Sequence, residues 1–266
     1  MDASLQHRLE RAIQVAREGG KSTLSRFQKV DLAVERKADD SPVTAADRDA
    51  ERLMRERLGE WFPDDAIVGE ELGEKSGASG FRWILDPIDG TKSFIGGVPL
   101  YSTLVGVERD GEPLIGVIYI PALDEGVYAA RGSGAFHFQA DSQPTPARVS
   151  RRSLADGIFV LSQVDSFAKR GARTAFDQLQ SAAYVTRTWG DGYGYLLVAT
   201  GRAELMVDPI MNVWDAAAIL PVLIEAGGTF TDWRGRATIR GGEGIATNGV
   251  ILEQVLAITS PFAPPS

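Results

Sequence analysis

The sequence predicts a layered protein of mixed α+β and α/β class. Its 266 residues are 44% hydrophobic and 24% charged, which is typical of a globular chain with a large core. Apolar runs at 101–107, 114–120 and 127–130 are separated by turn signals, and they predict an antiparallel meander in the first half. From residue 158 to residue 231, strand and helix candidates alternate, and this rhythm favours an α/β layer arrangement.

The first elements follow from the spacing of apolar residues. Residues 5–19 repeat them at helical intervals, so we expect an amphipathic helix there that ends at this point or continues to Phe27. The alternation of apolar and polar residues at 30–37 predicts a half-buried strand. The Ser, Pro and Thr residues of the segment 41–44 then provide the entry to a helix that ends near Leu58.

Two short apolar runs predict buried strands at 66–69 and 81–85. The segment 72–80 between them is rich in Gly, Ser and Lys, and we expect a flexible loop. A polar, proline-containing stretch at 139–149 marks the best candidate boundary between two halves. We therefore expect one domain over residues 1–266, with an α+β half to about residue 140 and an α/β half from about residue 150.

The second half alternates predicted strands and helices. Strands are expected at 158–161, 184–188, 203–207 and 229–231, and helices at 173–179, 193–200 and 215–225. Pro221 lies inside the last of these helices, so its early turns must be irregular or kinked. Asp191 and Asp215 stand at the openings of two helices, where an ordinary capping role is one explanation for each.

Composition excludes several classes of function. The absence of cysteine rules out disulfides, thiolate metal sites and a cysteine nucleophile, and it fits a reducing compartment. His7 and His137 lie in no recognisable motif, so we do not expect histidine catalysis. The net charge of -8 argues against a nucleic-acid partner. Because we find no signal-peptide pattern and no bilayer-length apolar run, we predict a cytoplasmic protein with no membrane partner.

The segment Asp86–Thr91 (sequence DPIDGT) carries the strongest chemical signal. Asp86 and Asp89 follow the apolar run 81–85, and two acids three residues apart in a tight turn can face one point. The proline between them favours a bend that could also direct the Ile88 carbonyl there. The next glycine allows close backbone approach to an anion such as phosphate. Oxygen ligands beside an anion site suggest Mg²⁺ and a phosphate ester, and the alternative is an ordinary Asp-Gly turn.

Two further acids are candidates because of their positions. Glu70 follows the predicted strand 66–69, so its side chain and that of Asp86 end neighbouring apolar runs and could converge. Asp47 falls in the first turn of its predicted helix, where its simplest role is to complement the helix dipole. Taken alone, each of these residues also has an ordinary structural explanation.

Considered together, three motifs resemble the inositol monophosphatase family of Mg²⁺-dependent phosphatases: Gly69-Glu70-Glu71, Asp86-Pro87-Ile88-Asp89-Gly90-Thr91 and Trp214-Asp215-Ala216-Ala217. The resemblance covers most of the chain and implies a five-layer α-β-α-β-α sandwich and a homodimer. It also implies two or three Mg²⁺ ions, held by Glu70, Asp86, Asp89, Asp215 and the Ile88 carbonyl. By the same resemblance, Asp47 and Thr91 would orient the attacking water, and Gly90 with Thr91 would hold the phosphate. We expect Glu70 to help this pair activate the water.

The chemistry of such a cluster agrees with this implication. Five carboxylates brought close together repel strongly unless divalent cations lie between them. Mg²⁺ ions lower the pKa of water and neutralise phosphate oxygens, so no protein nucleophile is needed. A Mg²⁺-dependent phosphomonoesterase acting on a small molecule is therefore the predicted enzyme.

Within the family, the segments 187–195 and 207–209 look most like the histidinol-phosphate phosphatases of histidine biosynthesis. This resemblance implies hydrolysis of L-histidinol phosphate, with Arg187, Asp191 and Asp208 as substrate contacts. The two acids could pair with the ammonium and imidazole groups of that substrate. Gly192 departs from the pattern, since we expect alanine or cysteine there. The alternatives are an inositol-1-phosphate or broad sugar-phosphate phosphatase, and, from another class, a binding protein with vestigial catalysis.

Overall fold

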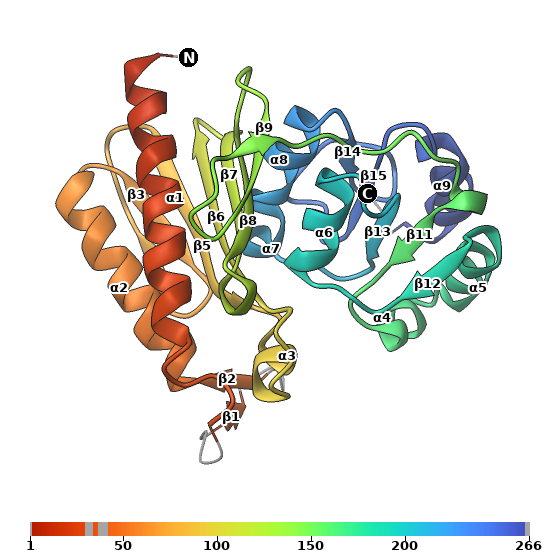
Figure 1. The fold of residues 1–266 in the computed structure, drawn as a ribbon, viewed down its shortest axis with the longest axis horizontal. Helices are drawn as coiled ribbons and strands as arrows, with labels where there is room; N and C mark the ends of the chain where they lie inside the picture. The colour runs from red at the N-terminus through yellow and green to blue at the C-terminus, as the bar shows by residue number, and fades with distance from the viewer. Residues whose placement is uncertain (1, 30–33, 37–41, 264–266) are drawn as a thin grey trace.

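The structure, a computed structural model, describes residues 2–29, 34–36 and 42–263. The two larger sheets of the described residues alternate with layers of helices across the molecule, as the ribbon shows from left to right (Figure 1). The helices of the first layer are α1 (Ala3–Thr23) and α2 (Ala45–Trp61). They pack on one face of the large sheet, and the predicted α-β-α-β-α sandwich is confirmed.

The large sheet contains eight strands and lies between the first and second helical layers. Its spatial order is β10 (Thr145–Pro146), β9 (Ala135–Gln139), β8 (Glu125–Ala130), β7 (Glu112–Ile120), β6 (Ser102–Arg109), β5 (Phe81–Asp89), β3 (Ala66–Gly69) and β4 (Gly73–Lys75). Neighbouring strands from β5 to β10 are antiparallel, which confirms the predicted meander, whereas β3 and β5 run parallel. The ends of β3 and β5 therefore meet at the same edge, as the positions of Glu70 and Asp86 suggested.

The second half supplies the remaining three layers. The middle layer contains α6 (Gly192–Ala199), α7 (Val213–Ala217) and α8 (Ile219–Glu225). The small sheet has the order β12 (Val185–Arg187), β11 (Ile158–Val160), β13 (Leu205–Asp208), β15 (Gly244–Thr247) and β14 (Thr229–Thr231). Its outer face is covered by α4 (Val164–Lys169), α5 (Arg173–Ala182) and α9 (Leu252–Thr259) (Figure 1).

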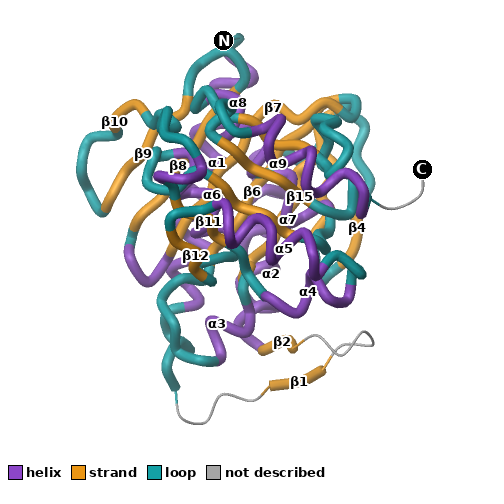
Figure 2. The backbone as a smooth tube through the Cα atoms, turned by 90° about the vertical axis from the view of Figure 1, so that its right-hand side faces the viewer, coloured by secondary structure: helices purple, strands orange, loops and turns teal. Residues whose placement is uncertain are grey.

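Several predicted elements differ from those observed. The chain enters α2 through β2 (Pro42–Thr44), which pairs with β1 (Val34–Arg36) in a ribbon beside α3 (Thr91–Ile95) (Figure 2). The rest of the predicted strand 30–37, and Ser41, lie outside the described residues. The loop predicted at 72–80 contains β4, because its residues complete a hairpin with β3. The predicted helix 215–225 is divided at Ala218 into α7 and α8, in agreement with the irregularity expected from Pro221.

The main apolar core joins the two halves of the chain. Ile84, Leu104 and Ile118 of the large sheet share one buried cluster with Val160 and Met206 of the small sheet. Burial of apolar surface is the dominant favourable contribution to folding, so this shared core favours cooperative folding of both halves. We propose that residues 1–266 form one domain with two structural halves.

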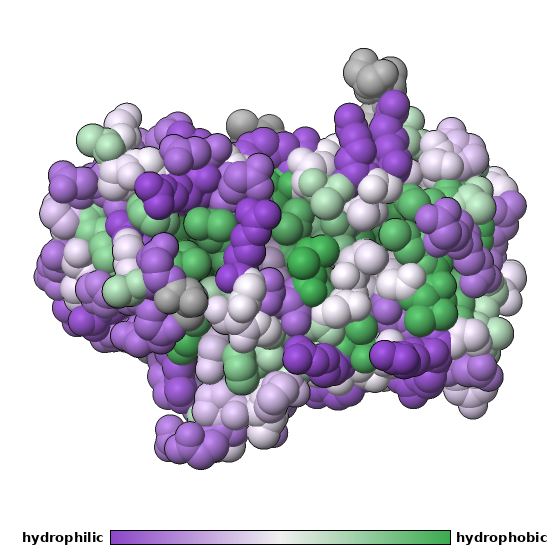
Figure 3. Space-filling model, turned by 90° about the horizontal axis from the view of Figure 1, so that it is seen from above, coloured by the Kyte–Doolittle hydropathy of each residue, from purple (hydrophilic) through white to green (hydrophobic). Residues whose placement is uncertain are grey.

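The surface mixes charged and apolar residues, as the space-filling view from above shows (Figure 3). Among the described residues, large apolar side chains such as Tyr184, Ile210 and Val250 remain exposed. No helix in the described ranges is both long enough and apolar enough to cross a membrane.

Candidate active site

Three carboxylates from two elements converge at the edge of the large sheet. One oxygen each of Asp86, Asp89 and Asp215 lies within 4.8 Å of the others. Asp86 pairs with Leu104 and Asp89 with Ser102, so three residue steps on β5 oppose two on β6. This irregularity is a local slip within an extended strand, and the prediction of a tight turn is wrong. An extra residue of this kind bends a strand and redirects its side chains.

Burial raises the free-energy cost of ionising the carboxyl groups of this cluster. The Asp86 side chain is 1% exposed, and burial raises its pKa well above the usual range, with further contributions from Glu70 and Asp89. Burial also raises the pKa of Asp89, with Asp191 adding to the effect. The pKa of Asp215 is raised to about 7, mainly by burial, with the Asn212 N–H bond opposing the rise and the nearby Glu70 adding to it. The cluster thus stabilises protons or other cations.

The donor set fits a magnesium ion. Among the described residues, Asp86 Oδ1 is buried without a hydrogen-bond partner, although a carboxylate oxygen is a strong acceptor. Mg²⁺ prefers such hard oxygen ligands, and a divalent charge would offset the mutual repulsion of the acids. Asp86, Asp89 and Asp215, with Glu70 in electrostatic contact, are therefore suited to hold it.

Asp47 and Thr91 meet beside this cluster. Asp47 Oδ2 accepts hydrogen bonds from the Thr44 N–H at 2.8 Å and from Thr44 Oγ1 at 2.6 Å, in a capping box at the start of α2. Its other oxygen, Oδ1, lies 3.5 Å from Thr91 Oγ1, which is also 3.2 Å from the Ile88 carbonyl. Asp47 is 1% exposed, and burial raises its pKa in spite of these bonds. Asp47 therefore has a structural role at the start of α2, and its contact with Thr91 leaves its predicted role toward water a prediction.

Gly90 connects the acids to the short helix α3. Its backbone is left-handed, with φ at +83°, a conformation that glycine adopts at no steric cost. A Cβ at this position would lie 2.5 Å from Asp191 Oδ2. Both the dihedral angle and the space therefore require glycine between Asp89 and Thr91.

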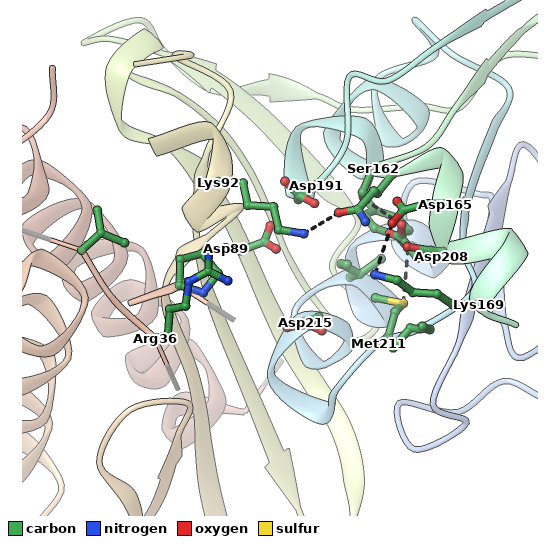
Figure 4. Close-up of a pocket in the computed structure, with 17 residues that line it drawn as sticks. Arg36, Asp89, Lys92, Ser162, Asp165, Lys169, Asp191, Asp208, Met211 and Asp215 are labelled. Carbon is green, nitrogen blue, oxygen red and sulfur yellow. Dashed lines mark hydrogen bonds and ion pairs between the residues drawn. The ribbon is translucent and has the colours of Figure 1, made fainter. Parts of the chain in front are cut away.

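A cleft of about 730 Å³ opens next to the acids. Figure 4 shows Arg36, Asp89 and Lys92 on one side, with Ser162, Asp165, Lys169 and Asp208 across from them. Residues of α4, the loop before it and the end of β13 form this far wall, and Lys92 Nζ reaches across to Gln163 Oε1 at 2.5 Å. Both halves of the chain contribute to the cleft.

Two further acids face the cleft. Asp208 Oδ1 accepts from Ser162 Oγ at 2.6 Å and Oδ2 from Tyr195 Oη at 2.8 Å. Burial raises the pKa of Asp208 to about 6, although these two donors oppose the shift. Burial also raises the pKa of Asp191, whereas Ser162 and Lys92 lower it. The cleft thus offers negative charge beyond the metal-binding acids.

The structure supports the predicted capping role for Asp215 but not for Asp191. Asp191 stands at the N-cap of α6, but its side chain makes no capping bond, so capping does not account for it. Asp215 does cap α7, because its Oδ2 accepts from the Asn212 N–H at 2.7 Å. Arg187 is exposed, lies over the Trp189 ring at 5.8 Å and is not among the residues that line the cleft. Asp191 and Asp208 are thus brought together, and Arg187 is not.

Sequence reasoning missed several polar residues of the site. Ser102 and Ser162 donate to Asp89 and Asp208, and Lys92 and Lys169 line the cleft. Lys92 directly follows the DGT segment, and this position was a sequence signal from which it could have been predicted as a site residue. The two serines carry no local signal, because each reaches a partner on a different element.

A model of the inositol monophosphatase family matches residues 4–261. The chain belongs to this family. A protein of Chlorobaculum parvum named histidinol-phosphatase is 44% identical over 239 residues, or 90% of this chain and 91% of that protein. A Mycobacterium tuberculosis protein of the same name is 39% identical, over 92% of this chain and 95% of that one. Among solved structures, an IMPase from Thermotoga maritima superposes with a TM-score of 0.84 at 32% identity, covering 96% and 98% of the two chains.

Proposed function

We propose that this chain is a Mg²⁺-dependent phosphomonoesterase that hydrolyses L-histidinol phosphate to L-histidinol and phosphate, in histidine biosynthesis. The observation that carries the proposal is the convergence of Asp86, which is buried, with the partly buried Asp89 and Asp215 beside a cleft with further acids. Membership of the inositol monophosphatase family, with relatives named histidinol-phosphatase, supports the same reaction.

The first task in the proposal is metal binding. Asp86, Asp89, Asp215, Glu70 and the Ile88 carbonyl would hold two or three ions. Bound Mg²⁺ would supply the positive charge that acidifies water and neutralises phosphate oxygens during in-line displacement.

The remaining residues orient the reactants. Thr44 fixes one oxygen of Asp47, so the other can position the Thr91 hydroxyl toward a water molecule, together with Glu70. The backbone at Gly90 and Thr91 would hold the phosphate, since its left-handed turn leaves no side chain in the way.

The acids of the far wall support a cationic substrate. Asp208 is fixed by two hydroxyl donors, and Asp191 lies at the opening of α6 between it and the metal-binding acids. Histidinol phosphate carries an ammonium and an imidazole that could pair with these groups, whereas a polyol requires neutral partners. A contact between Arg187 and substrate stays part of the proposal through the family resemblance alone.

A second candidate is an inositol-1-phosphate or broad sugar-phosphate phosphatase, which the resemblance to a T. maritima IMPase favours. The test compares kcat/KM for L-histidinol phosphate and inositol 1-phosphate with Mg²⁺ present. We expect a strong preference for histidinol phosphate, and an equal or greater value for inositol phosphate would overturn the choice of substrate. A lack of phosphate release from both, with and without Mg²⁺, would refute the phosphatase itself.

The proposal also includes a cytoplasmic homodimer with no membrane or nucleic-acid partner. Light scattering after size-exclusion chromatography would test the dimer, because the expected mass is twice the 28.7 kDa of one chain.

A further inference from the structure

Asp89 is held by two donors that approach the same oxygen. Its Oδ2 accepts from Ser102 Oγ at 2.5 Å and from the Gly192 N–H at 2.6 Å. A carboxylate oxygen has two lone pairs, so these donors occupy Oδ2 and leave Oδ1 for a cation. Hydrogen bonds to a charged acceptor are about twice as strong as neutral ones. Ser102 is fully buried, so its hydroxyl does not exchange this bond for one with solvent.

The two donors come from different layers of the fold. Ser102 begins β6 in the large sheet, and Gly192 begins α6 in the middle layer. The Gly192 N–H belongs to the first turn of its helix, where backbone donors have no partner within the helix. The bond to Asp89 satisfies this donor and connects the metal-binding strand to the second half of the chain.

Ser102 and Gly192 also fit each other sterically. A Cβ at Gly192 would lie 2.2 Å from Ser102 Oγ and 2.8 Å from Asp89 Oδ2. The backbone of Gly192 does not have a positive φ, so space and not the dihedral angle excludes a side chain. The alanine or cysteine expected here from the family resemblance would occupy the volume of the Ser102 hydroxyl. The hydroxyl of Ser102 therefore fits only because residue 192 is a glycine.

We infer that Ser102 and Gly192 form a paired positioning device that fixes Asp89 as a ligand through one oxygen, and so sets the affinity for Mg²⁺. This inference rests on the proposed metal-binding role of Asp89. Partners of this kind behind a metal ligand typically change metal affinity by roughly 10–100-fold when removed. Neither residue needs to touch the substrate.

The test measures Mg²⁺ binding to the phosphate-free, EDTA-treated full-length protein by titration calorimetry. We expect Ser102→Ala to raise the Kd for Mg²⁺ about tenfold, since one of the two donors is lost. Excess Mg²⁺ should restore kcat, with the KM for the phosphomonoester unchanged. Ser150→Ala is the matched control, because Ser150 Oγ also donates to a buried carboxylate, Glu204, at 2.8 Å but lies outside the cleft. It should lower stability and leave the Kd unchanged.

A double-mutant cycle tests the pairing. Gly192→Ala should weaken Mg²⁺ binding strongly in the wild type, because its methyl displaces the Ser102 hydroxyl. In the Ser102→Ala background, the same substitution should add clearly less, since that oxygen is already absent. If Gly192→Ala raised the Kd for Mg²⁺ by the same factor in both backgrounds, the two residues would act independently and the pairing would be overturned.

The outcomes also separate this inference from the proposed function. A Kd for Ser102→Ala within about twofold of wild type would overturn the positioning role even if Gly192→Ala failed to fold. If the wild-type protein itself bound no Mg²⁺, the proposed function would fail and the inference with it.

Discussion

Substituting Asp215 by asparagine should stabilise the metal-free protein while it removes Mg²⁺ binding. A carboxyl whose pKa moves from 3.8 to about 7 loses about 4 kcal/mol of folding free energy when ionised, at ~1.4 kcal/mol per tenfold change in proton affinity. Because the neighbouring acids share this repulsion, one neutral substitution should recover about 1–3 kcal/mol at pH 8. Asparagine retains an oxygen that can accept the Asn212 N–H bond.

The sign of the pH dependence follows from the raised pKa. Below the ordinary value of 3.8, Asp215 is protonated in both states and carries no penalty. As the pH rises from about 4 to about 7, the unfolded state ionises first, so the free energy of unfolding falls. It stays reduced above pH 7. Asp215→Asn should flatten this part of the curve.

Urea denaturation in EDTA at pH 5 and pH 8 measures this effect, with added Mg²⁺ as a second condition. We expect Mg²⁺ to stabilise the wild type and not the variant. Asp177→Asn, in an exposed pair with Arg173, is the control and should change neither property. If Asp215→Asn destabilised the metal-free protein at pH 8 as much as at pH 5, the account of the cluster as a repulsive cation site would be refuted.

Three further substitutions, with Arg52→Ala as the control for the last of them, test other parts of the molecule. Asp89→Asn should lower kcat by roughly 100-fold or more with little loss of folding, because a metal ligand is lost; near-normal turnover would remove it from the ligand set. Asp208→Asn should lower kcat/KM for histidinol phosphate by roughly tenfold and spare inositol phosphate, and an equal loss for both substrates would contradict the specificity role. Arg8→Ala should cost about 3–5 kcal/mol in urea denaturation, because Asp65, whose side chain is 2% exposed, loses its ion pair at 2.9 Å. Arg52→Ala, in an exposed pair, should cost less than about 1 kcal/mol, and a similar loss from both arginine variants would refute the burial argument.

Local patterns predicted much of the fold. The meander β6–β8 and the helices α1, α5 and α6 appear close to where the apolar residues placed them. The helices α1 and α5 each bury one face, whereas the strands and α6 are buried almost throughout. The elements α4, β15 and α9 were not predicted. They are four to eight residues long, and short segments are stabilised by tertiary packing more than by their own pattern.

The candidate site, like the fold, could be predicted from the sequence only in part. The sequence by itself determined which acids are candidates, since DPIDGT, Glu70 and the WDAA segment combine chemically specific residues at short range. Tertiary structure alone decided that Asp86, Asp89 and Asp215 converge, that Asp191 and Asp208 join the cleft, and that Arg187 does not line it. It also placed Ser102 and Gly192 on one oxygen of Asp89. Such contacts join residues that are distant in the sequence and lie in different layers of the fold. Their geometry depends on how the sheets and helices pack, which no local pattern encodes.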